Sequence, residues 1–179
     1  MLFHIDLWGL SKLKNTKKLI FLSLMTAIGI VLQVIESYMP FPIDLPGGKI
    51  GIANVVGLII IPMLGGVPAL IVAVLRACIG SLLFGGVISA IYSVSGAIAS
   101  TLTMIIAYKY IYPKASLIGV GVIGAVAHNT AQVTVATILL GNVGIFSYLP
   151  ILMIISIFTG GFSGLVAQMF LIRGVKIYD

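Results

Sequence analysis

Three strongly polar side chains, His128, Asn129 and Gln132, stand close together in the middle of a long apolar segment. An imidazole can donate or accept a hydrogen bond, and each amide can do both. His128 and Gln132 are four residues apart, so they share one face of a helix. Polar groups at bilayer depth are costly and usually face a cavity or a partner. The pattern therefore predicts a site that recognises a polar group inside a membrane.

The composition of the chain supports a membrane setting. Of its 179 residues, 60% are hydrophobic and 8% are charged, and the mean hydropathy is +1.25. Soluble domains carry roughly 25% charged residues, so we expect an all-α integral membrane protein. The chain is too short to add a sizeable soluble domain to several spans. Its net charge of +6 does not indicate nucleic acid binding, because the basic residues cluster at the ends of apolar segments.

A membrane span needs about 20 apolar residues, and six segments approach this length. They cover residues 19–38, 50–64, 67–84, 87–108, 116–140 and 148–172. Residues 1–18 form a basic, partly amphipathic leader suited to the membrane interface. Residues 19–172 then form a six-helix domain, followed by a tail at residues 173–179. The second segment is short and a tight turn joins it to the third, so the alternative is a helical hairpin that does not cross completely.

The basic residues predict the orientation of the chain. With six spans, eight of them fall on one side of the membrane: Lys12, Lys14, Lys17, Lys18, Lys109, Lys114, Arg173 and Lys176. The positive-inside rule makes that side cytoplasmic, so both termini are expected inside the cell. Lys49 lies in an outer connection, and Arg76 lies within a span.

Depth counting places the intramembrane polar residues in one half of the membrane. Each helical residue advances 1.5 Å, so Arg76 lies near the midplane of its span and His128 lies slightly beyond it. The other polar residues lie toward the outer surface: Gln33, Glu36, Asn54, Asn129 and Gln132. This bias predicts one substrate pocket that opens outward, with Lys49 near its mouth and residues 40–48 as a lid. The alternative is that Arg76 pairs with Glu36 and that the amides link helices.

Small residues spaced by four predict where helices pack closely. Gly160 and Gly164 in the sixth segment allow helix backbones to approach. In the first segment, Ser23 and Ala27 form a small patch that faces the cytoplasmic half. Internal packing is the favoured interpretation of this patch, and contact with a partner helix is the other.

Motifs for several chemistries are missing from the sequence. No Gly-rich loop followed by Lys and Ser or Thr occurs, so the P-loop route to ATP hydrolysis is not available. The two histidines and the single cysteine, Cys78, are too dispersed for a metal cluster. The paired Asp-rich motifs that hold magnesium on a prenyl diphosphate are also missing. We therefore expect no catalysis, no cofactor and no metal.

Three stretches of the sequence carry a family resemblance. They are KIGIAN at residues 49–54, Leu75-Arg76 with GSLLFGG at residues 80–86, and GAVAHN at residues 124–129 with Gln132. Over roughly residues 19–172 the chain resembles the family labelled heptaprenyl diphosphate synthase component I, also called the Gx transporter family. That family is in turn similar to the substrate-binding S-components of energy-coupling factor (ECF) transporters, which are six-helix membrane proteins with both termini inside.

The resemblance implies a binding subunit in the bacterial cell membrane that captures a small molecule from outside. A transmembrane T-component and two cytoplasmic ATPases would be its partners and would supply the energy. S-components contact the T-component through Ala-x-x-x-Ala on the first helix, where this chain has Ser23-x-x-x-Ala27. The expected substrate is vitamin- or isoprenoid-related, with an anionic group facing Lys49 and Arg76. The alternatives are a membrane subunit of polyprenyl diphosphate synthesis and a small oligomeric channel.

Overall fold

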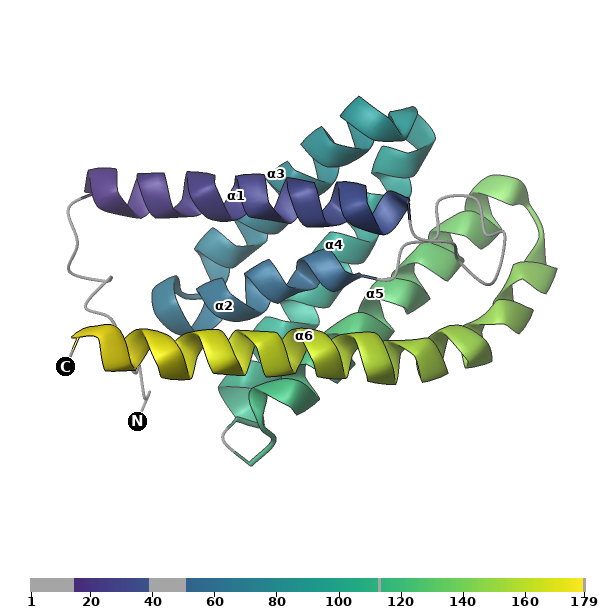
Figure 1. The fold of residues 1–179 in the computed structure, drawn as a ribbon. Helices are drawn as coiled ribbons and strands as arrows, with labels where there is room; N and C mark the ends of the chain where they lie inside the picture. Colours follow the sequence, from purple (N-terminus) through teal and green to yellow (C-terminus); the bar gives the residue numbers. More distant parts are fainter. Residues whose placement is uncertain (1–14, 39–50, 113, 179) are drawn as a thin grey trace.

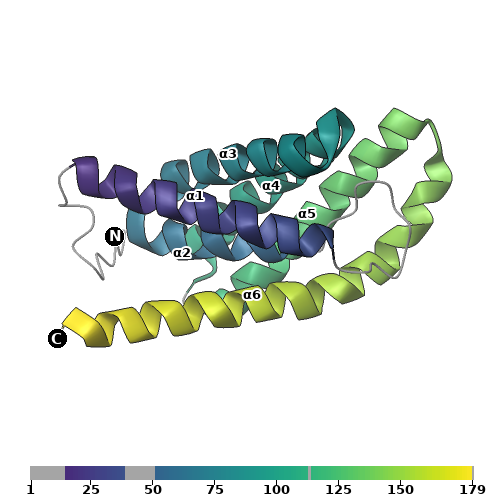
Figure 2. The ribbon, with the colours of Figure 1, turned by 45° about the horizontal axis from the view of Figure 1, so that its top comes forward.

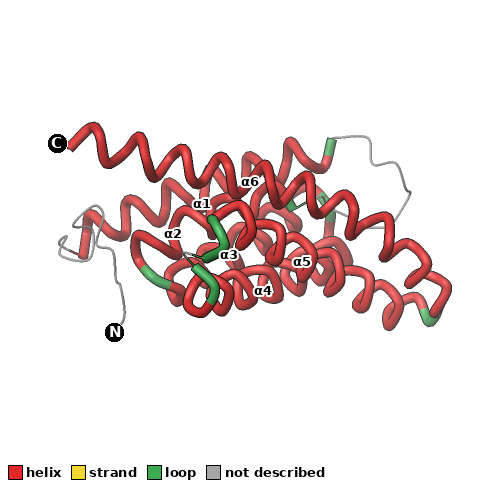
Figure 3. Tube along the Cα trace, turned by 90° about the horizontal axis from the view of Figure 1, so that it is seen from below, coloured by secondary structure: helices red, strands yellow, loops and turns green. Residues whose placement is uncertain are grey.

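The structure, a computed structural model, describes residues 15–38, 51–112 and 114–178, with side chains described as far as Arg173. Every regular element within these ranges is helical (Figure 3). In chain order the elements are α1 (Asn15–Ser37), the 3-10 helix η2 (Ile52–Asn54), α2 (Val55–Leu64), α3 (Gly66–Phe84), α4 (Gly86–Tyr110), α5 (Leu117–Leu140), the 3-10 helix η3 (Val143–Tyr148) and α6 (Leu149–Tyr178). The all-α fold is thereby confirmed over the described residues.

Five helices are long and apolar enough to cross a membrane, namely α1, α3, α4, α5 and α6 together with η3. This is consistent with a multi-pass membrane protein. The second predicted span is different, because η2 and α2 run only from Ile52 to Leu64. At 1.5 Å per residue they extend about 20 Å, compared with a hydrocarbon core of about 30 Å. Five of the six predicted spans therefore correspond to helices of sufficient length and apolar character, and the second is too short to cross alone.

The short helix α2 lies inside the bundle. All residues from Val55 to Met63 are buried, and α2 packs against α3 and α6 and also touches α1, α4 and α5. A helix can end at membrane depth only where protein surrounds its ends. Gly65 alone connects α2 to α3, with φ of +94° and ψ of 179°, a conformation that side chains with a Cβ rarely adopt. The result is a tight α2–α3 hairpin in the core.

The first and last described helices have their outer ends at the same end of the bundle. α1 starts and α6 finishes there, on the left of Figure 1 and Figure 2. Apart from Arg76, the basic residues with described side chains lie at the start of α1, at the α4–α5 connection and toward the end of α6: Lys17, Lys18, Lys109, Lys114 and Arg173. The arrangement fits the predicted topology, while the cytoplasmic location of this end stays a prediction.

The boundaries of the first and last predicted segments differ from the helices. α1 begins at Asn15, inside the predicted leader, and α6 continues to Tyr178, through most of the predicted tail. Residues 1–14 of the leader lie outside the described residues. Lys49 and the predicted lid at residues 40–48 also lie outside them.

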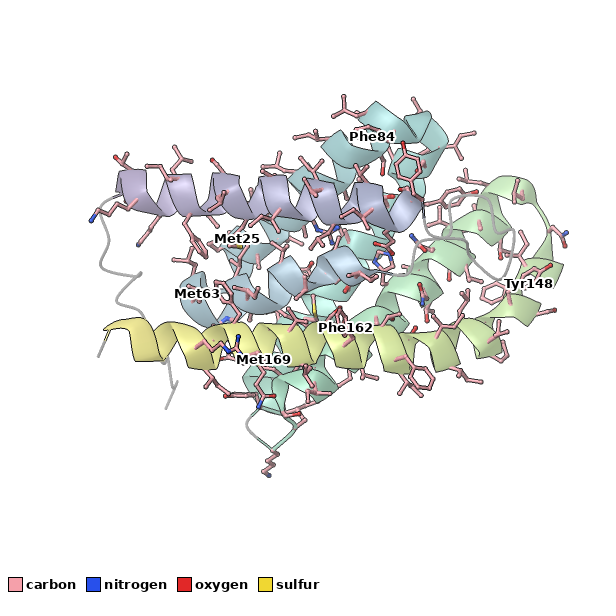
Figure 4. All side chains as sticks on the ribbon, viewed as in Figure 1. Met25, Met63, Phe84, Tyr148, Phe162 and Met169 are labelled. Atoms are coloured by element: carbon pink, nitrogen blue, oxygen red, sulfur yellow. The ribbon has the colours of Figure 1, made fainter. Side chains whose placement is uncertain are left out.

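The half of the bundle that holds the chain ends has an apolar core. Its buried side chains come from α1, α2, α3, α4, α5 and α6 and include Met25, Met63, Val72, Met104 and Val120. In Figure 4, Met25 and Met63 lie toward this end, whereas Phe84 and Tyr148 lie toward the other. We refer to this part as the apolar half.

α5 and α6 form the most extensive helix pair. A Cβ on Gly160 would lie 2.6 Å from the carbonyl oxygen of Gly121, and a Cβ on Gly164 would lie 2.4 Å from the Cα of Ile118. Both distances are far below a normal contact, and the neighbouring atoms are backbone. The close approach predicted from the spacing of Gly160 and Gly164 is therefore present, and its partner helix is α5.

Candidate binding site

Arg76 is the centre of a buried polar cluster in the half of the bundle opposite the apolar half. Its side chain is 4% exposed. Its Nη2 donates to Oδ1 of Asn54 at 2.6 Å, and its Nη1 donates to Oε1 of Gln33 at 3.5 Å. Gln33 in turn donates from Nε2 to Oγ of Ser81 at 2.8 Å. A charge inside an apolar bundle requires such partners, and here they tie α1, η2 and α3 together.

Glu36 lies one turn beyond Gln33 on α1. Its Oε1 accepts a hydrogen bond from the backbone N–H of Gly51, the residue that precedes η2. The carboxylate also interacts electrostatically with the guanidinium of Arg76. Gly51 has φ of +85°, in the left-handed region that favours glycine. Glu36 thereby holds the start of the helix that continues into α2.

His128 reaches the same cluster from α5. A Cβ on Gly51 would lie 3.5 Å from Cδ2 of His128 and 2.9 Å from Nδ2 of Asn54. A Cβ on Gly96 of α4 would lie 2.8 Å from Cε1 of His128. The imidazole is therefore in contact with two glycines, one from α4 and one at the start of η2. Gln132 is buried one turn further along the same face of α5.

Glycines also provide the space for the side chains of Gln33 on α1 and Arg76 on α3. A Cβ on Gly29 of α1 would lie 2.6 Å from Cδ of Arg76, and a Cβ on Gly80 of α3 would lie 3.1 Å from Cδ of Gln33. Sequence analysis did not identify these glycines as part of the site. A signal was available, because Gly29 lies at about the same depth in its span as Arg76.

Asn129 makes its hydrogen bonds outside this cluster, toward α6. Its Nδ2 donates to Oγ of Ser156 at 2.8 Å and to the carbonyl oxygen of Leu152 at 3.4 Å. Ser156 donates its own hydroxyl to the same carbonyl at 2.7 Å. In this structure Asn129 links two helices, as the alternative interpretation of the amides stated. Ser156 was missed in the sequence because a single serine in an apolar helix carries little signal.

The structure brings together most of the predicted binding residues. Those in or beside the cluster are Gln33, Glu36, Asn54, Arg76, His128 and Gln132, and each is between 3% and 6% exposed. The sequence predicted a pocket open to the outside, and its opening stays a prediction. Among the described side chains, the amide oxygens of Gln33 and Asn54 compensate the guanidinium of Arg76 locally. Lys49, the remaining predicted member, lies outside the described residues.

Ser23 and Ala27 lie on the outer face of α1 and are exposed. Leu24 and Val31 on the same face are 55% and 56% exposed. Internal packing of the small patch, the favoured interpretation from spacing, is therefore wrong. The patch belongs to a surface that contacts lipid or another helix.

The described residues offer no metal site, and they form an apolar groove away from the cluster. No group of three His, Cys, Asp or Glu side chains in this part of the chain could hold a metal ion. A shallow groove of about 520 Å³ lies between α4 and α5 and is lined mainly by small apolar residues. The hydroxyls of Thr103 and Thr130 within it donate to carbonyls of their own helices. The groove therefore offers hydrocarbon contact, and the polar recognition chemistry lies in the cluster around Arg76.

The family model described as heptaprenyl diphosphate synthase component I matches residues 25–170. The chain belongs to this family. The matched range extends from Met25 in α1 to Phe170 in α6 and so includes the whole polar cluster. Searches with the chain found no match among curated proteins or among solved structures.

Proposed function

We propose that this protein is the membrane-embedded substrate-binding subunit of an ECF-type importer. The observation that supports the proposal is the burial of Arg76 and Glu36 beside the start of a short internal helix. Ionisable residues inside a membrane bundle typically mark a substrate or ion pathway. In transporters, short or broken helices that begin near the midplane typically bind anionic substrate groups with their N-termini.

In this proposal a small molecule enters from the outside and replaces part of the resting network. Arg76 neutralises an anionic group of a vitamin- or isoprenoid-related substrate. Gln33, Asn54 and Gln132 supply directional hydrogen bonds, and His128 donates or accepts one. Lys49 acts near the mouth, as the sequence predicts. Asn129 supports the site by holding α5 against α6.

The energy for uptake comes from partner proteins, because the sequence has no P-loop. The partners we propose are a transmembrane T-component and two cytoplasmic ATPases in the bacterial plasma membrane. The exposed face of α1 around Ser23 and Ala27 is the proposed contact with the T-component, since small residues let helices approach closely.

The proposal is tested by identifying and then measuring a bound molecule. Mass spectrometry of small molecules retained by the purified protein supplies the candidate. Arg76→Ala and His128→Ala are each expected to weaken its binding by at least about tenfold, or about 1.4 kcal/mol. Thr134→Ala, on the exposed face of α5, is the control and is expected to bind normally. Unchanged affinity in both cluster variants would show that the cluster is not the binding site.

A second function is favoured by the description of the family. In that case the protein would be a membrane subunit that presents a polyprenyl diphosphate to a soluble synthase. Affinity purification from the native membrane distinguishes the two functions. Recovery of a T-component and ATPases supports the importer, whereas recovery of a prenyl synthase without them supports the second function.

A further inference from the structure

The carboxylate of Glu36 is in a position where an external anion would be stabilised. It accepts the N–H of Gly51 at the start of η2, which leads directly into the ten-residue helix α2. The N-terminus of a helix carries a partial positive charge. The guanidinium of Arg76 adds a full positive charge, with which Glu36 interacts. Glu36 itself is 5% exposed.

The side-chain amide of Asn54 is a second hydrogen-bond donor beside Gly51, and it has a hydrogen that no described acceptor takes. Oδ1 of Asn54 accepts from Arg76 at 2.6 Å, whereas Nδ2 of Asn54 has no acceptor among the residues that the structure describes. Asn54 is 4% exposed. Its Nδ2 faces Gly51, since a Cβ on Gly51 would lie only 2.9 Å away. A buried donor without an acceptor is costly, so this group is available to an oxygen that the described residues do not supply.

We propose that Arg76, Asn54 and the start of the η2–α2 helix form an oxyanion subsite, which Glu36 occupies in this structure. The inference rests on the proposed function and specifies its ligand as a molecule with a carboxylate or phosphate group. That group replaces the carboxylate of Glu36 as the negative charge that interacts with Arg76 and accepts from Nδ2 of Asn54. Glu36 is thus a competitor of the ligand and does not bind a cationic part of it.

Gly51 makes this exchange possible. It has no side chain to clear, and the side chains of Asn54 and His128 fill the space that a Cβ on Gly51 would need. Its bond to Glu36 is the contact that the exchange breaks. Once it breaks, Gly51 can move away from the side-chain amide of Asn54 and make room for the oxygens of the ligand.

The experiment uses acetate and inorganic phosphate as probes of the two oxyanion types. The purified full chain in detergent is titrated with each salt against chloride at constant ionic strength, and the thermal unfolding midpoint is recorded. Glu36→Ala opens the subsite and is expected to show a saturable rise with at least one anion. The wild type is expected to require at least about tenfold more anion for the same rise, because its own carboxylate competes. Glu36→Ala combined with Arg76→Met is expected to show no saturable rise.

Several results would overturn the proposal. One is a Glu36→Ala protein whose midpoint responds to neither anion, and another is an equal response in the double variant. If Glu36→Ala does not fold, Glu36→Gln replaces it, since the amide keeps the acceptor for Gly51 and removes the competing charge. Glu36→Gln must then bind one anion more tightly than the wild type. A stabilisation of the wild type by methylammonium that Glu36→Gln abolishes would also contradict the proposal.

Failure of this inference can be told apart from failure of the proposed function. Normal uptake by the assembled importer without any anion response means that the recognised group is not an oxyanion. An anion response that depends on Arg76, in a protein that supports no uptake, would support the subsite. It would at the same time contradict the transport role.

Discussion

The two halves of the bundle bury their interiors in different ways. In the apolar half, side chains such as Met25, Val72 and Met104 make non-directional van der Waals contacts. In the other half, Arg76 and Gln33 depend on specific acceptors at specific distances. Dispersion contacts tolerate small rearrangements, whereas a buried polar network is costly whenever one member loses its partner. The half in which the loss of one partner costs most free energy is also the half that can recognise a ligand.

The largest expected effect comes from breaking the charge balance of the polar half. Arg76→Met leaves the carboxylate of Glu36 buried without its guanidinium, and we expect a loss of about 3–5 kcal/mol of stability. Equilibrium unfolding in detergent measures it. Adding Glu36→Gln removes the stranded charge, so the double variant is expected to recover at least about half of the loss. Equal losses in the single and double variants would show that packing against Gly29, and not charge, sets the cost.

The apolar half is tested at its closest helix crossing. Gly164→Ala places a Cβ 2.4 Å from the Cα of Ile118 and 2.6 Å from the carbonyl oxygen of Leu117. Because backbone atoms cannot move aside individually, we expect a loss of about 1–3 kcal/mol. Gly161→Ala is the matched control: its nearest neighbour is 4.0 Å away, and its change should stay within about 0.5 kcal/mol. A similar loss in both variants would mean that glycine matters here through helix flexibility.

A smaller effect is expected where the polar half meets α6. Asn129→Ala removes the hydrogen bond to Ser156, and interhelical hydrogen bonds in membranes contribute roughly 0.6 kcal/mol on average. We expect a loss of about 1 kcal/mol and little change in affinity for a retained molecule. A double-mutant cycle with Ser156→Ala measures the coupling. A large loss of affinity with normal stability would show that Asn129 does bind the ligand.

The smallest effect on stability is expected on the outer face of α1. Ser23 is exposed on the surface of the bundle, so Ser23→Leu should change the free energy of unfolding by less than about 0.5 kcal/mol. Its proposed role predicts a reduced recovery of the T-component in affinity purification. Thr134→Leu, at an exposed position of α5, serves as the control and should leave recovery unchanged. Equal recovery with both variants would exclude this face of α1 as the contact.

Much of the fold could be predicted because burial in a membrane leaves a strong signal in the sequence. Apolar length identified five spans, and the placement of Gln33, Glu36 and Arg76 in one half followed from counting residues along helices. The interior position of α2 could not be derived in the same way. Its residues are as apolar as those of a lipid-facing helix, and only its short length distinguished it.

The details of the site depended on contacts that hydropathy does not record. Whether Asn129 points to Arg76 or to Ser156 is decided by helix rotation, and neighbouring residues on a helix point in directions about 100° apart. The exposure of Ser23 and Ala27 likewise depends on which side of α1 meets α3. Glycines at positions 29, 51 and 96 gave no polar signal, although they determine which side chains fit.

The buried helix α2 also constrains the order in which the chain is assembled. A segment of about 20 Å is too short to be stable as a separate insertion unit, and Gly65 joins it to α3 without a loop. We therefore expect the two to enter the membrane as one unit. α2 later packs against α6, the last helix to be synthesised. The core cannot close during synthesis of the first five segments, so a chain truncated before α6 should be a substrate for membrane quality control and not a partly active protein.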